Sequence, residues 1–353
     1  MKQRQSNFEL LRIISMFLIV LHHYGIHGTF YEGTFSWQKV GLNLVTSFGK
    51  VGVNIFVLIS AYFLVNKTFK LERIYRTLLE TLFYSYLVLG IYWFFDRNSP
   101  YLNKTNIIHL IFPIPLEYWF VNAFLFMLCL SPFLNVMIHH LNRRSYLFLL
   151  SFLTFIWVII PTVSNLKLAG YSDYAWFVYL YLVAGFMRNH ELHISKVSLR
   201  WIFYGSVLIT LLLVADLNIL GKSNQFFMDY AIFFIFQNKL PIVLTSFSLF
   251  LLAKDWRLGS NRFINTISSA TLGVYLIHDN VVIRVALWTF VNNAQYKTLL
   301  SSVGMGFVVA TVVYLTCTVI DLVRQLFLAK LMNWLAVKLA DGTRWLFRSR
   351  TLN

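Results

Sequence analysis

Long apolar stretches alternate with short polar links along the whole chain. A helix needs about 20 mostly apolar residues to cross a bilayer. The chain offers about ten such stretches: 8–26, 44–65, 77–95, 118–138, 146–163, 173–187, 201–220, 227–253, 267–290 and 299–322. This pattern predicts an all-α, polytopic integral membrane protein with about ten transmembrane helices. An even number of spans places both termini on the same side.

Two of these stretches differ from a simple helix. The stretch 227–253 holds Asn238, Lys239 and Pro241, which predict a kink or a broken helix that lines a polar cavity. The stretch 173–187 is short. A merger of the fifth and sixth stretches, which would change the topology, therefore stays open.

Composition supports a membrane protein. Of the 353 residues, 58% are hydrophobic and only 12% are charged, and the mean hydropathy is +0.65. A soluble domain has about 25% charged residues, so a water-soluble globule is excluded. The two cysteines, Cys129 and Cys317, lie inside apolar stretches and have no metal-ligand spacing. We therefore expect neither a disulfide framework nor a metal site.

The net charge of +16 is divided unequally between the two sides of the membrane. Of the 30 Lys and Arg residues, 21 lie at the N-terminus, in the even-numbered links and after residue 322, and eight, Lys50 among them, on the opposite side. By the positive-inside rule both termini are predicted to be cytoplasmic. The protein itself is predicted to lie in the cell's plasma or inner membrane. The excess charge then points to anionic lipid rather than to nucleic acid. Residues 324–353, rich in Leu, Phe, Trp and basic residues, are expected to form a basic amphipathic cytoplasmic tail.

The first helix carries the most informative polar residues. Arg12 and His23 are 11 residues apart, which puts them on one helix face and about 16 Å apart along the axis. Ionisable side chains inside a membrane are costly, so each marks a candidate functional site. The alternative is that Glu9 and Arg12 form a local ion pair at the interface while His23 marks the end of the helix.

Four further groups of residues are candidates. Lys67, Lys70, Arg73 and Arg76 follow the second stretch, where Arg73 and Arg76 could face one phosphate-bearing ligand; simple anchoring at the lipid surface is the alternative. Asn54 and Ser60 are polar positions within 52–64, where close helix packing is the alternative. Glu117 and Trp119 lie at the start of the fourth stretch. Tyr275 and His278 lie three residues apart in the ninth stretch, where the alternative for His278 is a buried, hydrogen-bonded histidine without a catalytic role.

Taken together, these motifs resemble acyltransferase family 3, bacterial integral-membrane enzymes that O-acylate cell-surface glycans and related molecules. They follow the family's order along nearly the whole chain: Arg12 and His23 separated by ten residues, the run 52–64, Arg73-x-x-Arg76, Tyr118-Trp119-Phe120, and Tyr275-Leu276-Ile277-His278. Two positions depart from the family pattern, with Asn54 in place of an acidic residue and Ala61 in place of a glycine. Residues 1–323 would form the membrane domain of a stand-alone member.

The resemblance implies a membrane-bound O-acyltransferase, in most cases an O-acetyltransferase, with acetyl-CoA or another acyl-CoA as donor and no metal. For such a reaction we hypothesise that neutral His23 acts as general base, that Arg12 helps to position the donor, and that the basic cluster holds the CoA phosphates. This cluster consists of Lys67, Lys70, Arg73 and Arg76. Glu117 is the remaining candidate catalytic residue. Asn54, Ser60, Trp119, Tyr275 and His278 would line the cavity. The acceptor would be a glycan or its lipid-linked precursor.

A polysaccharide or lipid transporter or flippase is the alternative function, because ten spans with polar residues at depth suit it equally well. Paired broken helices in corresponding halves would favour transport. The sequence predicts one broken span, near Lys239, and no matched partner in the first half.

Overall fold

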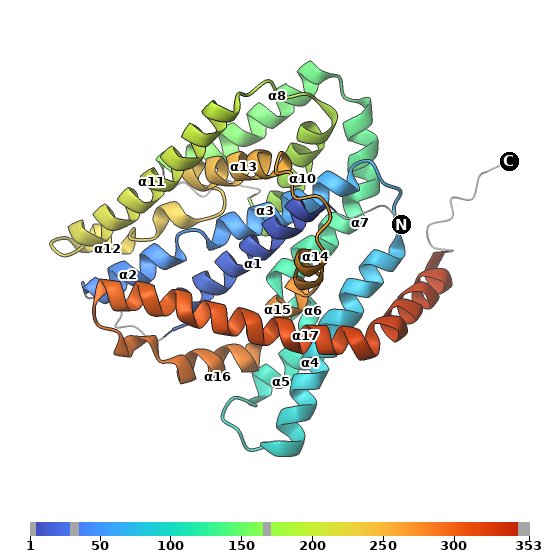
Figure 1. Cartoon of the computed structure of the whole chain (residues 1–353), viewed down its shortest axis with the longest axis vertical. Coiled ribbons are helices and arrows are strands. Elements are labelled where there is room, and N and C mark those ends of the chain that lie inside the picture. Colours follow the sequence, from blue (N-terminus) through green and yellow to red (C-terminus); the bar gives the residue numbers. More distant parts are fainter. Residues whose placement is uncertain (1–4, 29–34, 165–170, 345–353) are drawn as a thin grey trace.

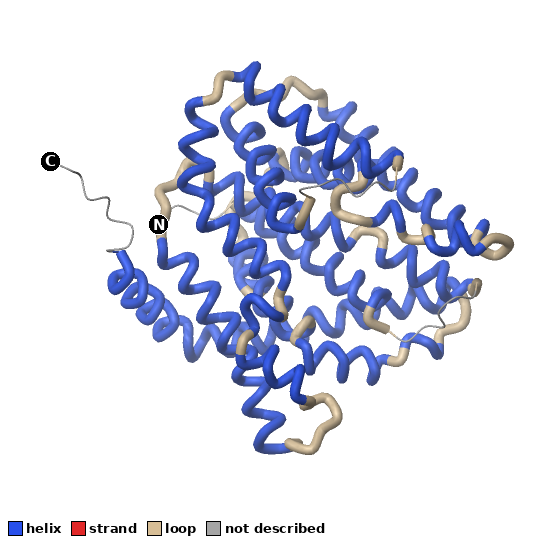
Figure 2. Tube along the Cα trace, turned by 180° about the vertical axis from the view of Figure 1, so that it is seen from behind, coloured by secondary structure: helices blue, strands red, loops and turns tan. Residues whose placement is uncertain are grey.

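The computed structural model describes residues 5–28, 35–164 and 171–344, which form helices and connecting loops without a strand (Figure 2). Figure 1 shows the helices gathered around α1 and α3. The elements are α1 Ser6–Ile26, α2 Trp37–Thr46, α3 Gly49–Leu64, α4 Leu71–Phe95, α5 Lys104–Ile111, α6 Pro113–Leu116, α7 Trp119–His140, α8 Arg143–Thr154, the π-helix η1 Phe155–Ile159, α9 Ile160–Val163, α10 Asp173–Asn189, α11 Lys196–Leu220, α12 Gln225–Asp229, the 3₁₀ helix η2 Phe233–Ile235, α13 Leu240–Lys254, α14 Arg262–Ser269, α15 Thr271–His278, α16 Val281–Val291, the 3₁₀ helix η3 Asn293–Gln295 and α17 Leu299–Thr343.

The all-helical membrane class is confirmed, with fewer candidate spans than the sequence suggests. Among the described residues, eight helical segments are long and apolar enough to cross a membrane, or nine if one bent pair counts as a span. The predicted sixth span is α10, which has only 17 residues and lies at the lower limit for spanning. The fifth and sixth stretches form separate helices rather than one. The cytoplasmic position of the termini stays a prediction.

The second candidate span starts earlier than the hydropathy pattern predicts. Helices α2 and α3 follow each other closely and together form a 28-residue span, Trp37–Leu64, rather than one that begins at residue 44. This shift places Lys50 near the middle of the span, whereas in a span that begins at residue 44 it would lie near one end. A cation at this depth needs a functional or structural reason.

The predicted break near Lys239 is present. Helix α12 and the 3₁₀ helix η2 precede Lys239, and α13 begins directly after it with Pro241 in its first turn. Proline suits a first turn because its missing N–H has no helical partner there. The Lys239 ammonium donates to the carbonyl of Pro161, and the Asn238 amide donates to that of Trp157 at 3.0 Å.

The ninth predicted span is broken, contrary to the continuous helix expected over 267–290. Residues Arg262–His278 and Val281–Gln295 meet at an angle of 84°. The Asn280 side chain accepts from the backbone N–H of Val282 at 3.1 Å and so begins α16. An asparagine at this position stabilises a helix start, which the hydropathy pattern cannot reveal. The break leaves Asp279 in the turn between the two helices.

The central contact of the fold joins α1 and α3. Two glycines allow the close approach: a Cβ on Gly52 would lie 2.3 Å from the carbonyl oxygen of Ser15, and one on Gly49 would lie 2.2 Å from Cβ of His22. Small residues at such contacts let helix backbones approach closely in a membrane. Helices α2, α13, α14, α15 and α17 also pack against α1. The position of the α1 polar face is therefore fixed from several sides.

Helix α17 runs without interruption for 45 residues along one side of the bundle and packs in turn on α2, α1, α15 and α4 (Figure 1). The boundary predicted between membrane domain and tail, at residues 323 and 324, thus lies inside a continuous helix. Arg324 is buried in the bundle. Residues 345–353 of the predicted tail lie outside the described part of the chain.

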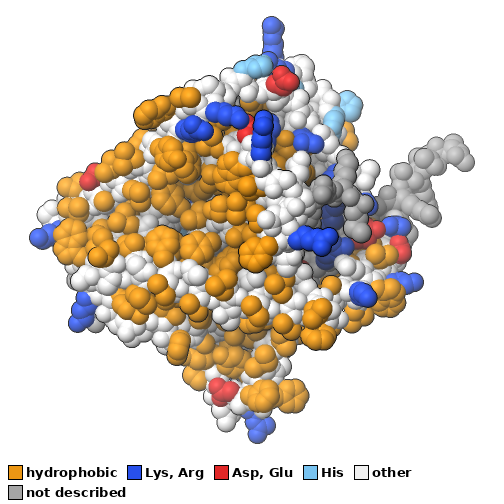
Figure 3. Space-filling model, in the orientation of Figure 1, with side chains coloured by type: hydrophobic (Ala, Val, Ile, Leu, Met, Phe, Trp, Pro, Cys, Tyr) orange, Lys and Arg blue, Asp and Glu red, His pale blue; other side chains and the backbone are white. Residues whose placement is uncertain are grey.

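The surface agrees with a lipid environment. Figure 3 shows one face on which apolar side chains cover a broad area, while Lys and Arg lie mainly toward its edges. Phe148, Trp201 and Phe307 are among the exposed large apolar side chains. In water such an extensive apolar surface would aggregate, whereas lipid chains cover it without penalty.

The glycine contact gives the first prediction. Gly52→Ala forces α1 and α3 apart and should destabilise the protein by about 1–3 kcal/mol, as overpacking does. Gly90→Ala in α4 is the control, because a Cβ there has nothing within 4 Å. The measurement is unfolding of the two purified variants in detergent, and equal stability of both would contradict the predicted contact.

Candidate active site

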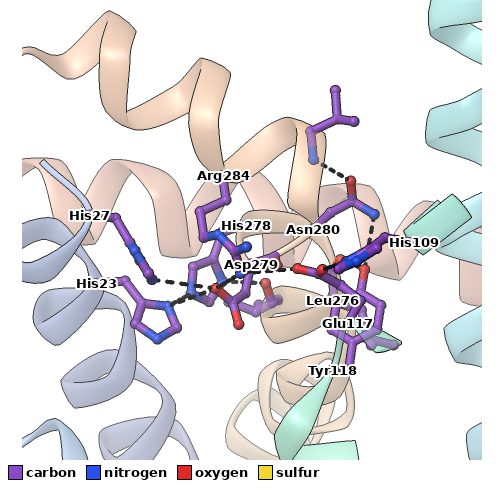
Figure 4. A network of polar contacts seen from close by, with 12 residues as sticks. His23, His27, His109, Glu117, Tyr118, Leu276, His278, Asp279, Asn280 and Arg284 are labelled. Carbon is purple, nitrogen blue, oxygen red and sulfur yellow. Dashed lines mark hydrogen bonds and ion pairs between the residues drawn. The ribbon is translucent and has the colours of Figure 1, made fainter. Parts of the chain in front are cut away.

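His23 lies near the C-terminal end of α1, buried among residues from the broken ninth span (Figure 4). Its Nδ1 is 2.9 Å from Nε2 of His278 and 3.6 Å from Oδ1 of Asp279. The same Asp279 oxygen is 3.7 Å from Nε2 of His27. A contact between residues 255 positions apart in sequence thus joins two of the predicted site residues, His23 and His278.

The hydrogen bonds fix which nitrogen of each imidazole carries a proton. Nδ1 of His278 contacts the backbone carbonyl of Val274, and a carbonyl can only accept, so this nitrogen carries the hydrogen. A neutral His278 then accepts through Nε2, and His23 must donate through Nδ1. Nε2 of a neutral His23 is left with a lone pair. The arrangement therefore defines which nitrogen of a neutral His23 can accept a proton.

Arg284 joins Asp279 to Glu117. Its Nη1 lies 3.0 Å from Oε1 of Glu117 and 3.3 Å from Oδ1 of Asp279, and His109 Nδ1 lies 2.8 Å from Oε2 of Glu117. Glu117 and Asp279 are both almost fully buried, and a buried carboxylate without a cation is strongly unfavourable. Within the described part of the chain, Glu117 is therefore connected to His23 through Arg284 and Asp279.

Tyr118 ties the helix break to α7. Its hydroxyl donates to the carbonyl of Leu276 at 2.9 Å and accepts from the side-chain amide of Asn280 at 3.0 Å. These bonds satisfy one backbone carbonyl at the end of α15. The turn that holds Asp279 beside His23 is therefore fastened from a second helix.

A small cavity lies against His23. It measures about 20 Å³ and is lined by Met16, Ile19, His22, His23, Gly49, Lys50, Val53, Trp119, Phe120 and Tyr275. Trp119 and Tyr275 are thus brought to His23, as the sequence suggests. The Nδ1 of His22 donates to the backbone carbonyl of Thr46 at 2.7 Å, so this nitrogen is not available as a base.

Two larger cavities lie beside Arg12, further toward the N-terminus of α1 than His23. Ser60 of α3 lines both of them. One measures about 220 Å³ and also contacts Lys67 and Arg73. The second measures about 420 Å³ and also contacts Arg76. Three of the four basic residues predicted to hold phosphates are therefore collected around Arg12. Lys70, at the start of α4, is exposed and lines neither cavity.

Two site predictions find a different setting. Arg12 and Glu9 lie 3.8 Å apart, so the local ion pair expected as an alternative is present. Asn54 donates to the carbonyl of Gln237 at 2.9 Å and accepts from the indole N–H of Trp176 at 2.9 Å. It is fully buried, and these bonds give its side chain a packing role between α3, α10 and the start of α13.

A buried charge network was missed by the sequence analysis. Arg324 contacts Glu80 at 2.8 Å and Asp321 at 2.7 Å, and Tyr84 donates to Asp321 at 2.6 Å. Glu80 and Asp321 both fall inside predicted spans, where an acidic residue is a signal in itself. Glu80 and Arg324 line the 420 Å³ cavity, so the network fixes α4 and α17 around it.

His23, His27 and Asp279 are residue types that bind metal, and their ligand atoms lie within 4.8 Å of one another. The guanidinium of Arg284 is already 3.3 Å from the shared Asp279 oxygen. A divalent cation at that oxygen would be repelled by this charge. We therefore assign the group to orienting the histidines.

The arrangement can be compared with known proteins. The acyltransferase-domain model of acyltransferase family 3 matches residues 5–320. This chain belongs to acyltransferase family 3. The match includes both halves of the site, the α1 residues Arg12 and His23 and the late residues Tyr275 and His278. No curated protein and no solved structure matches the chain.

Membership in acyltransferase family 3, together with the apolar helices, makes the chain a multi-pass membrane acyltransferase.

The charge chain beside His23 gives the second prediction. Arg284→Met removes the guanidinium between the buried Asp279 and Glu117 carboxylates, and should destabilise the protein by about 3 kcal/mol. Arg257→Met, at an exposed arginine, is the control. Unfolding in detergent measures the stability of both variants. An Arg284 variant as stable as the control would show that the Glu117–Arg284–Asp279 charges have no structural role.

Proposed function

We propose that this protein transfers an acyl group, in the first instance acetyl, from acyl-CoA on the cytoplasmic side to a hydroxyl of a cell-surface glycan or its lipid-linked precursor in the bacterial inner membrane. The observation that supports this most strongly is the His23–His278 hydrogen bond, which leaves His23 Nε2 as the basic atom beside a buried cavity.

The donor fits the basic cavities around Arg12. CoA is polyanionic at its nucleotide end, and guanidinium groups bind phosphates through paired hydrogen bonds. Arg73 lines one of these cavities and Arg76 the other, with Arg12 common to both. The thioester arm would then follow the α1 face from Arg12 to His23, about 16 Å away at 1.5 Å per residue.

In the transfer step, His23 Nε2 removes the proton of the acceptor hydroxyl while its oxygen attacks the thioester carbon. The carbonyl electron pair moves to oxygen, and collapse of this intermediate breaks the carbon–sulfur bond. The CoA thiolate leaves and takes the proton from His23. Asp279 and Arg284 stay in place and hold His23 and His278 in position throughout.

Among the described residues, the breaks at Lys239 and at Asp279 both lie in the second half of the chain. Transporters built from inverted repeats place broken helices in corresponding halves. The positions of these breaks therefore favour the acyltransferase over the transporter.

His23→Ala should lower acyl transfer by about 10²-fold to 10⁴-fold, the usual contribution of a general base. His140→Ala is the matched control, since His140 is exposed at the end of α7. The rate is measured in membrane vesicles as the transfer of labelled acyl groups from acyl-CoA to the envelope glycans. Wild-type rates in the His23 variant would refute the assignment.

Arg76→Gln should raise the KM for acyl-CoA roughly tenfold, the effect of losing one charged contact of about 1.4 kcal/mol, with little change in kcat. Arg143→Gln changes an exposed arginine on α8 and serves as control. An unchanged KM for the Arg76 variant would show that the nucleotide end of the donor does not bind in this cavity.

Mass spectrometry of envelope glycans, with and without the gene, would identify the acceptor.

A further inference from the structure

Lys50 has no explanation in the site described so far. It lies near the middle of the Trp37–Leu64 span, where an ammonium group is unfavourable unless it is paired or used. The residues that the structure describes provide it with no hydrogen bond and no ion pair. Its Nζ lies 4.4 Å from the ring centroid of Trp119, a contact that holds the cation without neutralising it.

Lys50 lines the same 20 Å³ cavity as His23. A second polar group there is the hydroxyl of Tyr275, which is buried and makes no close hydrogen bond within the described part of the chain, with the Asp279 carboxylate nearby. A buried hydroxyl of this kind can donate to a group bound in the cavity. A cation and a hydroxyl donor together suit an oxygen that carries negative charge.

Apart from the imidazole of His22, the rest of the cavity wall is apolar. Met16 and Ile19 contribute from α1, Val53 from α3 and Phe120 from α7. A volume of about 20 Å³ is enough for one water-sized group, since roughly 10–15 Å³ is the minimum for a water. The cavity therefore has room for a single group of the size of a methyl or a carbonyl oxygen, and no room for a longer chain.

We propose that this cavity is the acyl chamber of the enzyme, with Lys50 and Tyr275 as the groups that stabilise the oxyanion and with Val53 and its apolar neighbours limiting the acyl group to acetyl. This inference rests on the proposed function. As the acceptor oxygen bonds to the thioester carbon, the carbonyl π pair moves to oxygen, and the Lys50 ammonium and Tyr275 O–H hold that charge. When the pair returns, the carbon–sulfur bond breaks and the thiolate leaves with the proton from His23.

Preorganised donors aimed at a developing oxyanion contribute mainly to the chemical step. Lys50→Met should therefore lower kcat about 10²-fold to 10³-fold and leave the KM for acetyl-CoA nearly unchanged. It should also unfold no more easily than wild type, because it replaces an unpaired buried charge with an apolar side chain of similar length. A lysine that only supported the fold would show the reverse pattern. Lys104→Met, at an exposed lysine, is the control.

The chamber wall gives a test that does not depend on Lys50. Val53→Ala enlarges the chamber, and should raise the rate with butyryl-CoA relative to acetyl-CoA by about tenfold, the effect of roughly one or two accommodated methylenes. Val57→Ala is the matched control, because Val57 is equally buried one turn further along α3 and does not line the chamber.

The experiment uses inverted membrane vesicles that contain each variant, supplied with acetyl-, propionyl- or butyryl-CoA labelled in the acyl group. Label in the glycan and lipid fraction is counted. If wild type transfers acetyl and His23→Ala does not, while the Lys50 and Val53 variants both behave like wild type, the chamber is refuted and the proposed function stands. If wild type transfers no acyl group from any of the three acyl-CoA donors, both the acyl chamber and the proposed function are overturned.

Discussion

The hydrogen bond between His23 and His278 is the interaction on which the site depends. His278 is the last residue of α15, and the ninth span breaks directly after it, at Asp279 and Asn280, beside the C-terminal part of α1. A continuous helix would not provide the turn in which Asp279 lies. The Tyr118 hydroxyl and the Asn280 side chain satisfy polar groups at the break, so an irregular backbone is tolerated inside the bundle.

Buried charges in this protein fall into two groups with different uses. The Glu80–Arg324–Asp321 network joins two long helices beside the larger cavity, while the Glu117–Arg284–Asp279 chain lies behind the histidines. In both groups an arginine lies between two carboxylates, so each carboxylate has a nearby cation. Lys50 differs, because in the described part of the chain an aromatic ring lies beside it and the carboxylates of Asp173 and Asp279 act on it only from beyond ion-pair distance.

The sequence allows part of this to be predicted. Helix periodicity alone puts Arg12 and His23 on one face, and the structure places both at cavities on that face. The break near Lys239 follows from a proline and a lysine in an apolar stretch. The contact of His23 with His278 could not be predicted from spacing, because it depends on how α15 packs against α1. The break at Asp279 depends on a cap by Asn280 within an otherwise apolar stretch, and hydropathy averages over it.

The central claim is that neutral His23 carries its proton on Nδ1 and keeps Nε2 free to act as a base. Solid-state ¹⁵N NMR of the histidine-labelled protein in lipid tests it directly, with His23→Gln and His278→Gln used to assign the signals. The account predicts that both imidazoles are neutral near pH 7, each with its proton on Nδ1. A His23 with its proton on Nε2, or one that is already an imidazolium, would contradict it.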